Sequence, residues 1–129
     1  MESAWLEKLH DETLVLLEEA RDYARDGRDE NSDRQAGHGT IPWYAFEISR
    51  VSTLLIDAMA WVLVWRAVDN EEMTRHEALE PEWRLMRSEV LDEGFDGSAD
   101  LDPRLLQLAD ASIALHKRLR RLERRLMDA

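Results

Sequence analysis

The sequence predicts an all-α protein, and two features of the chain support this. Three segments carry apolar residues at steps of three and four, the spacing of one helix face. All 5 glycines lie between these segments, where they interrupt no helix, and no segment alternates like a strand. Three long helices pack most simply as an up-down-up three-helix bundle, with a broken helical segment between the second and third. At 129 residues the chain fits a single domain, 1–129.

The first helix is expected over residues 3–25. Its apolar seam is an a/d stripe of the kind that packs antiparallel helices. The following residues, 26–40, are polar, contain glycine and show no periodicity, so we expect a flexible loop there. The seam consists of Leu6, Leu9, Thr13, Leu16, Ala20 and Tyr23.

The second helix, residues 43–68, is the most informative segment. Thr40 is a suitable N-cap and Pro42 suits the first turn. From Leu54 to Trp65 every residue except Asp57 is apolar, which is more apolar surface than one seam can bury. The stripe expected to face the other two helices is Ile48, Val51, Leu55, Ala58, Val62 and Trp65. The remaining apolar surface is covered either by residues 69–101 or by a second subunit. Its candidate protein-interface residues are Leu54, Trp61, Trp65 and Val68.

Residues 69–102 are expected to form an irregular linker with broken helical structure. Thr74 and Glu77 have the spacing of a capping box, which indicates a short helix. Pro81 either interrupts that helix or opens another, and a loop is expected from about 93 to 102. Pro103 begins the third long helix, with Asp102 as its N-cap. The seam of this helix is Leu105, Leu108, Ser112, Leu115, Leu119, Leu122 and Leu126.

Charge and composition limit the classes of function. The chain has 28 acidic and 17 basic residues, a formal net charge of -11, which argues against general binding to nucleic acid or anionic membranes. It has no cysteine, its N-terminal residues are acidic rather than signal-like, and the apolar segment between Arg50 and Arg66 is too short to cross a bilayer. We therefore expect a cytoplasmic protein without a membrane partner.

The end of the third helix is basic, in contrast to the rest of the chain. Four of its residues are candidates for charged docking to an acidic protein partner. The same cluster could also contact nucleic acid, although cations at a helix C-terminus often serve only to complement the helix dipole. The docking candidates are Lys117, Arg118, Arg121 and Arg125.

The residues give little support for catalysis, and we expect no enzyme, no cofactor and no metal. Glu7 and His10 form a single Glu-x-x-His pair, whereas di-metal bundles need two such pairs and two further glutamates. Asp57 could be an acid of raised pKa among apolar residues, or a structural carboxylate that reaches solvent or a basic side chain. The structural interpretation is favoured, because no neighbouring residue suggests a reaction.

A resemblance to a known family is carried by the second and third helices. The matching runs are Tyr44-Ala-Phe-Glu-Ile-Ser-Arg, Ser52-Thr, Trp61-Val-Leu-Val-Trp-Arg-Ala-Val, Pro103-Arg-Leu-Leu and Ala114-Leu-His-Lys-Arg-Leu. On these residues the chain resembles the RcdA family, the regulators of CtrA degradation. The resemblance implies a cytoplasmic three-helix protein that forms a homodimer and has no active site. Leu54 and Trp65 depart from the family, which has a basic and a polar residue near these places.

The resemblance also implies a function. Members of the family act as adaptors that link the ClpXP protease, an unfoldase primed by the response regulator CpdR, to cargo such as the cell-cycle regulator CtrA. By this resemblance the chain is expected to be a non-enzymatic adaptor that tethers regulatory proteins to the protease. The alternative is a small helical regulator that binds nucleic acid through the basic end of the third helix.

Overall fold

Three long helices make up most of the protein. The computed structural model describes the backbone of residues 3–35, 43–86 and 103–129, and the side chains of residues 4–26, 46–86 and 103–129. The long helices are α1 (Ser3–Gln35), α2 (Trp43–Asp69) and α5 (Pro103–Asp128). Between α2 and α5 lie the short helix α3 (Arg75–Ala78) and the 3-10 turn η1 (Pro81–Trp83). The described residues contain no strand, so the all-α prediction is confirmed.

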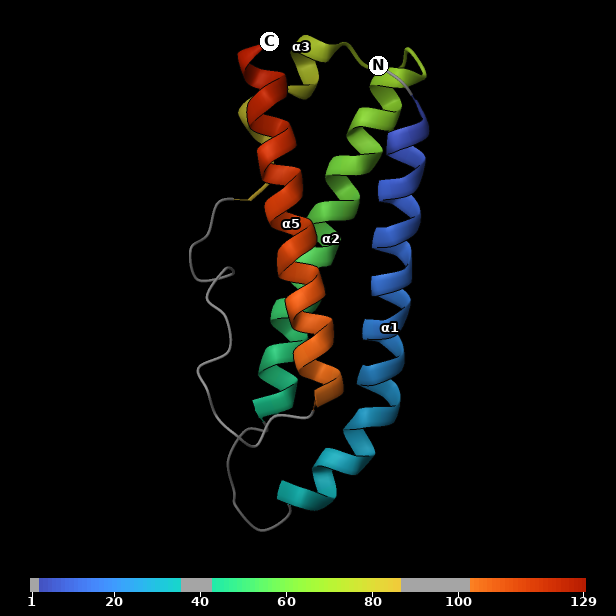
Figure 1. Ribbon diagram of the computed structural model, residues 1–129, viewed down its shortest axis with the longest axis vertical. Coiled ribbons are helices and arrows are strands. Elements are labelled where there is room, and N and C mark those ends of the chain that lie inside the picture. Colours follow the sequence, from blue (N-terminus) through green and yellow to red (C-terminus); the bar gives the residue numbers. More distant parts are fainter. Residues whose placement is uncertain (1–2, 36–42, 87–102) are drawn as a thin grey trace.

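The three long helices pack side by side, but their directions differ from the prediction. α1 runs opposite to α2, whereas α2 and α5 run the same way (Figure 1). Two hydrogen bonds between α2 and α5 show that these helices are parallel. Asp57 bonds to His116 and Trp61 bonds to Glu123, so residue numbers increase in the same direction along both helices. The predicted up-down-up order is therefore wrong. The direction of α5 is set by these contacts between distant residues, which the periodicity of a single helix does not encode.

The core follows the predicted seams closely. All six seam residues of α1 are buried, and so is the whole stripe of α2 that was expected to face its neighbours. On α5 the first five seam residues are buried, and Leu122 and Leu126 are partly buried against the core. Two hydroxyls lie within these seams, and each donates to the carbonyl one turn earlier, Thr13 at 2.6 Å and Ser112 at 2.7 Å. Their polarity is thus satisfied inside their own helices.

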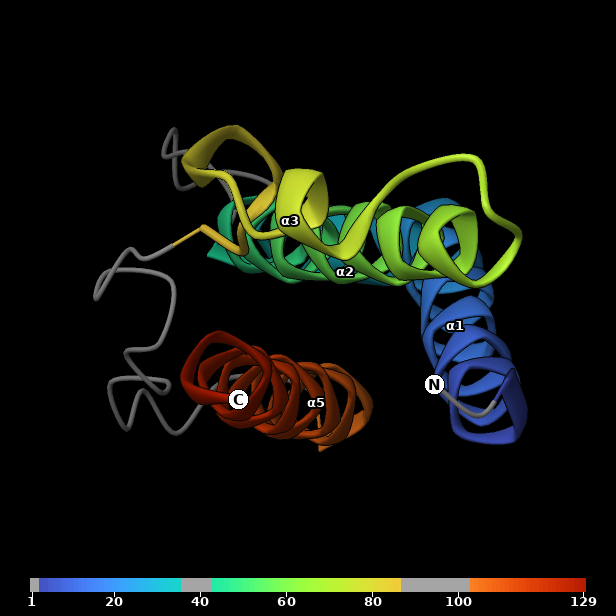
Figure 2. The ribbon, with the colours of Figure 1, turned by 90° about the horizontal axis from the view of Figure 1, so that it is seen from above.

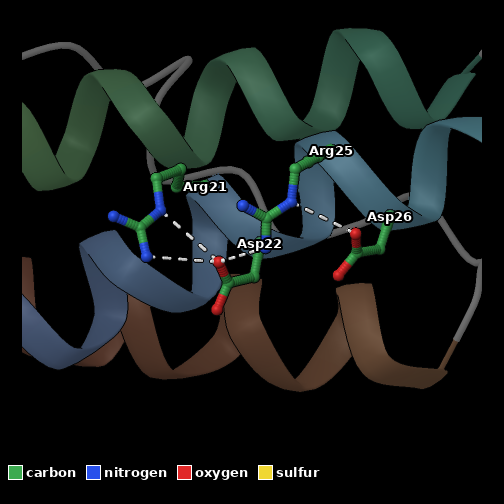
Figure 3. A network of polar contacts seen from close by, with 4 residues as sticks. All are labelled: Arg21, Asp22, Arg25 and Asp26. Carbon is green, nitrogen blue, oxygen red and sulfur yellow. Dashed lines mark hydrogen bonds and ion pairs between the residues drawn. The ribbon is translucent and has the colours of Figure 1, made fainter.

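α1 is longer than the sequence predicts. It continues to Gln35, so the flexible loop expected over residues 26–40 is wrong for 26–35, and 36–40 lie outside the described residues. A helix that is polar all round can persist when many side-chain pairs support it. Such pairs occupy the preceding turns, where Asp22 accepts from Arg21 and Arg25, and Asp26 accepts from Arg25 (Figure 3). The loss of apolar periodicity after residue 25 therefore did not mark the end of the helix.

α2 has the expected extent, and it is the most apolar helix. The expected N-cap Thr40 and the first-turn Pro42 lie outside the described residues. Within the described part of the chain, Phe46–Asp69 is the one stretch long and apolar enough to cross a membrane by length and composition alone. Of the most apolar window of this stretch, 39% is buried inside the protein, where α2 packs against α1 and α5.

The residues after α2 form a short irregular stretch that lies against it (Figure 2). The capping box is confirmed, because the Thr74 hydroxyl accepts from the Glu77 amide and the Glu77 carboxylate accepts from the Thr74 amide. Pro81 opens the 3-10 turn η1 and does not continue α3. Glu71 has a positive φ of 62°, a left-handed conformation that turns the chain back at the end of α2. Asp102 and the loop expected from 93 to 102 lie outside the described residues.

Candidate functional site

Most of the predicted interface of α2 is buried inside the protein. Leu54, Trp61 and Trp65, which were candidates for an interface if a second subunit covered this surface, are 1%, 2% and 0% exposed within the one chain. Val68 is partly buried against the core. The cover comes from the chain itself, because Ala78 and Leu85 of the linker belong to the same core cluster as the two tryptophans. Among the described residues the surface is covered within the one chain, by α5, whose Glu123 accepts from Trp61, as well as by the linker segment.

A buried polar site lies where α2, α5 and the linker meet. Asp57 of α2 accepts two hydrogen bonds on Oδ2, from His116 Nε2 at 2.7 Å and from the Met86 amide at 3.0 Å. The His116 side chain is 1% exposed and that of Asp57 is 12% exposed. Asp57 therefore pairs with a basic side chain of another helix, as its structural interpretation allowed. Its carboxylate also fixes the backbone of the linker.

A second carboxylate, further along the bundle, also accepts one hydrogen bond from a side chain and one from a linker amide. Glu123 of α5 accepts on Oε2 from the indole N–H of Trp61 and from the Leu85 amide, both at 2.9 Å. Glu123 is 2% exposed, and an uncompensated charge at such a depth would be strongly destabilising. Hydrogen bonds from two donors offset that penalty. The two carboxylates thus hold consecutive backbone amides of one linker segment.

Sequence reasoning did not identify His116 and Glu123 as site residues. Glu123 lies among the lysine and arginine residues at the end of the third helix, so this end was interpreted as a basic surface. A signal was present, because Ala109, His116 and Glu123 follow one another at steps of seven beside the leucine seam. When one heptad position holds alanine, then histidine, then glutamate, it indicates a buried helix face that contains polar side chains. The Asp57–His116 pair lies beneath the linker. Its role in this structure is structural, because Asp57 accepts from His116 and from the Met86 amide.

The exposed face of α2 carries a second stripe that the sequence reasoning did not assign. Its members recur at steps of three and four, and each is exposed. Three are large apolar residues, and Ile56 is 62%, Phe46 56% and Leu63 49% exposed. The other members are small, which would let another helix approach closely. We call this the outer stripe of α2, and it consists of Phe46, Ser49, Thr53, Ile56, Ala60 and Leu63.

The charged docking candidates on α5 fall into two groups. Arg118 donates two hydrogen bonds of 2.8 Å to the carboxylate of Glu12 on α1, and this pairing raises the pKa of Arg118 above its ordinary value. Lys117, Arg121 and Arg125 are exposed and form no ion pair among the described residues. These three cations follow one another at steps of four, so they lie along one face of α5. We call them the basic face of α5.

The metal half-motif of α1 has other partners. The Glu7 carboxylate lies 3.4 Å from Arg66 of α2, and His10 Nδ1 lies 3.4 Å from the Asp11 carboxylate. Across residues 3–35, 43–86 and 103–129, no group of three or more His, Cys, Asp or Glu side chains is placed to hold a metal ion. An open cavity of about 390 Å³ lies where α2 turns into α3, and it is lined by Val68, Glu71, Glu72, Met73, Thr74, Arg75 and Glu77.

Comparison with known proteins gives one match. No curated protein and no solved structure matches the chain. One family of sequences matches all of it, residues 1–129, and is described as a protein of unknown function, DUF1465. The buried polar site and both surface features therefore lie within the region that the family covers. The chain belongs to the DUF1465 family.

Proposed function

We propose that this protein is a cytoplasmic, non-enzymatic adaptor in regulated bacterial proteolysis, which tethers cell-cycle regulators to the ClpXP protease. The resemblance of α2 and α5 to the RcdA family supports this, and the DUF1465 family includes RcdA-like proteins. The proposed partners are the unfoldase with its priming response regulator, a CtrA-like cargo and a second copy of this chain. Tethering would act by raising the local concentration of the cargo at the unfoldase.

The observation that carries the proposal is the presence of two different exposed surfaces on one small bundle. The outer stripe of α2 is apolar and suits a helical partner, because helix-in-groove recognition uses anchors at steps of three and four. The basic face of α5 lies on another helix and suits an acidic partner. With the outer stripe occupied by a second copy of this chain, the dimer would present two basic faces, one on each copy, and could hold two acidic partners at once.

The dimer is proposed to use the outer stripe of α2. The interface residues predicted earlier cannot serve, because Leu54, Trp61 and Trp65 lie in the core of one chain. Large exposed residues at 46, 56 and 63 are separated by serine, threonine and alanine, so two copies could interdigitate. Trp is favoured at binding hot spots, but here the two tryptophans of α2 are used for folding.

A reconstituted degradation assay tests the adaptor function. Purified protease, its priming response regulator and a fluorescent CtrA-like substrate are mixed with and without this protein, and substrate half-life is measured. We expect the protein to shorten the half-life and the variant Arg121→Glu to lose part of that effect. The control Lys8→Glu makes the same charge change at an exposed site on α1. An unchanged half-life with every priming factor present removes the adaptor proposal.

The second candidate function is binding of nucleic acid through the basic face of α5. Three exposed cations without ion pairs among the described residues favour it, whereas the net charge of -11 opposes it. Filter binding of duplex DNA across a salt series separates the two functions. Phosphate contacts would give an affinity that falls steeply with salt and with Arg121→Glu. Absence of binding at low salt eliminates this candidate.

A further inference from the structure

The linker segment of residues 79–86, which we call the strap, is held in an unusual way. It contains η1 and ends at the two amides that bond to Glu123 and Asp57. One side chain anchors its end, because Leu85 is 3% exposed and belongs to the core cluster. Neighbouring apolar side chains remain in solvent, with Trp83 42% and Met86 47% exposed. The end of the strap is therefore attached by one fully buried apolar side chain and by its backbone, and Leu79 at its start is partly buried against the core.

The hydrogen bonds at this contact do not depend on the strap's side chains. Leu85 and Met86 both donate through the main-chain N–H, to carboxylates on two different helices. Any polypeptide in a similar conformation has the same donors, unless proline occupies one of the positions. We call the part of α2 and α5 beneath the end of the strap, which includes Asp57, His116 and Glu123, the groove. It holds a backbone with one buried apolar anchor, a mode shared with sites that capture extended peptides.

A permanent cover would not need buried carboxylates. Well-packed apolar residues in place of a buried ionic group are often neutral or stabilising. Carboxylates at the contact with the strap behave differently. When the strap lifts, water can replace the amide donors of the strap, and this reduces the free-energy cost of lifting it. The His116 Nδ1 atom is also buried without a hydrogen-bond partner among the described residues, so the strap does not satisfy every polar atom of the groove.

We propose that the groove between α2 and α5 binds an extended segment of a partner protein, and that the strap occupies this groove in the absence of the partner. The segment that fits places a leucine-sized side chain in the position of Leu85 and donates two consecutive backbone N–H groups to Glu123 and Asp57. The residue after the leucine cannot be proline. This inference concerns the groove alone and stands or falls independently of any role in proteolysis.

The test weakens the strap and supplies its sequence as a separate peptide. Met86→Pro removes the N–H that bonds to Asp57 while altering an exposed side chain, and Met86→Ala is the control that keeps the N–H. The probe is a fluorescein-labelled peptide with the sequence of residues 79–86, measured by fluorescence anisotropy. We expect the peptide to bind Met86→Pro about tenfold or more tightly than the wild type, and Met86→Ala to behave like the wild type.

A second peptide, with proline in place of the final methionine, checks the recognition chemistry. We expect its binding to Met86→Pro to be about tenfold or more weaker, because it lacks the donor to Asp57. Hydrogen exchange of the Leu85 amide reports whether the strap lifts. The proposal is overturned if Met86→Pro leaves this amide as protected as in the wild type. It is equally overturned if the variant loses its helical fold, if a lifted strap leaves no binding of the first peptide, or if both peptides bind equally.

Discussion

At the scale of single residues, two buried carboxylates hold together three parts of the chain. Asp57 and Glu123 lie on neighbouring helices, and each accepts one hydrogen bond from a side chain of the opposite helix and one from the linker backbone. Such groups are expensive to bury alone, so each depends on its donors. The stability of the site is therefore concentrated in a few hydrogen bonds whose removal leaves a buried acceptor short of a partner.

Trp61→Phe tests this dependence. The variant keeps most of the ring but removes the indole N–H that bonds to Glu123, so we expect the free energy of unfolding to fall by about 1–3 kcal/mol. Urea unfolding followed by circular dichroism measures it. Trp83→Phe is the matched control, because that side chain is 42% exposed and far less stability depends on it. Equal losses in the two variants would show that the hydrogen bond to Glu123 contributes nothing.

At the scale of elements, helical structure occurs in sequences that lack an apolar seam. α1 continues to Gln35 through a polar sequence without the apolar spacing of residues 3–25, and α3 is a helix of only 4 residues. In α1 the preceding turns carry arginine–aspartate pairs, which are exposed and individually worth little. In α3 a capping box supplies the missing hydrogen bonds at the N-terminus.

Thr74→Ala is expected to loosen α3 without unfolding the bundle. The variant removes the hydroxyl that accepts from the Glu77 amide, a loss of about 1 kcal/mol for a typical N-cap. Hydrogen exchange at the Ala78 amide, which donates to the Thr74 carbonyl, should therefore become about fivefold faster. Thr74→Ser keeps a hydroxyl and should exchange like the wild type. Unchanged exchange in Thr74→Ala would mean that tertiary contacts alone hold α3.

At the scale of the whole molecule, the bundle buries Trp61 and Trp65 of α2 inside and leaves another apolar stripe of α2 outside. Trp61 and Trp65 pack against each other with ring centroids 6.0 Å apart, in the core. The outer stripe of α2 is left without cover from the described residues of the same chain. Exposed apolar residues along one helix face often mark protein interfaces. The proposed dimer would bury this stripe.

Ile56→Glu tests the dimer. We expect sedimentation equilibrium to give a dimer for the wild type and a monomer for the variant, because a charge would then lie in an apolar interface. Val15→Glu is the control, since Val15 is 52% exposed on α1 and lies outside the outer stripe. Trp65→Glu is unsuitable for this purpose, because Trp65 is fully buried and the variant would report on folding. A monomeric wild type would refute the dimer.

Local patterns were sufficient to predict the three long helices and the faces they bury. The seam of α1 and the inner stripe of α2 are buried residue for residue, because a period of 3.6 places those side chains on one side whatever the neighbours are. The capping box of Thr74 and Glu77 is equally local. The buried polar site was not predicted, since its two carboxylates are defined by partners 59 and 62 residues away.

The sequence by itself determined that this protein is all-α, where its long helices begin, and which stripe of each helix is apolar. Tertiary structure alone decided that α5 runs parallel to α2, that Trp61 and Trp65 are buried within the one chain, and that Asp57 meets His116. The physical reason is that periodicity fixes the face of a helix but not its direction or its neighbour. Those depend on contacts between residues far apart in the sequence, such as the two backbone amides of the strap that bond to the buried carboxylates.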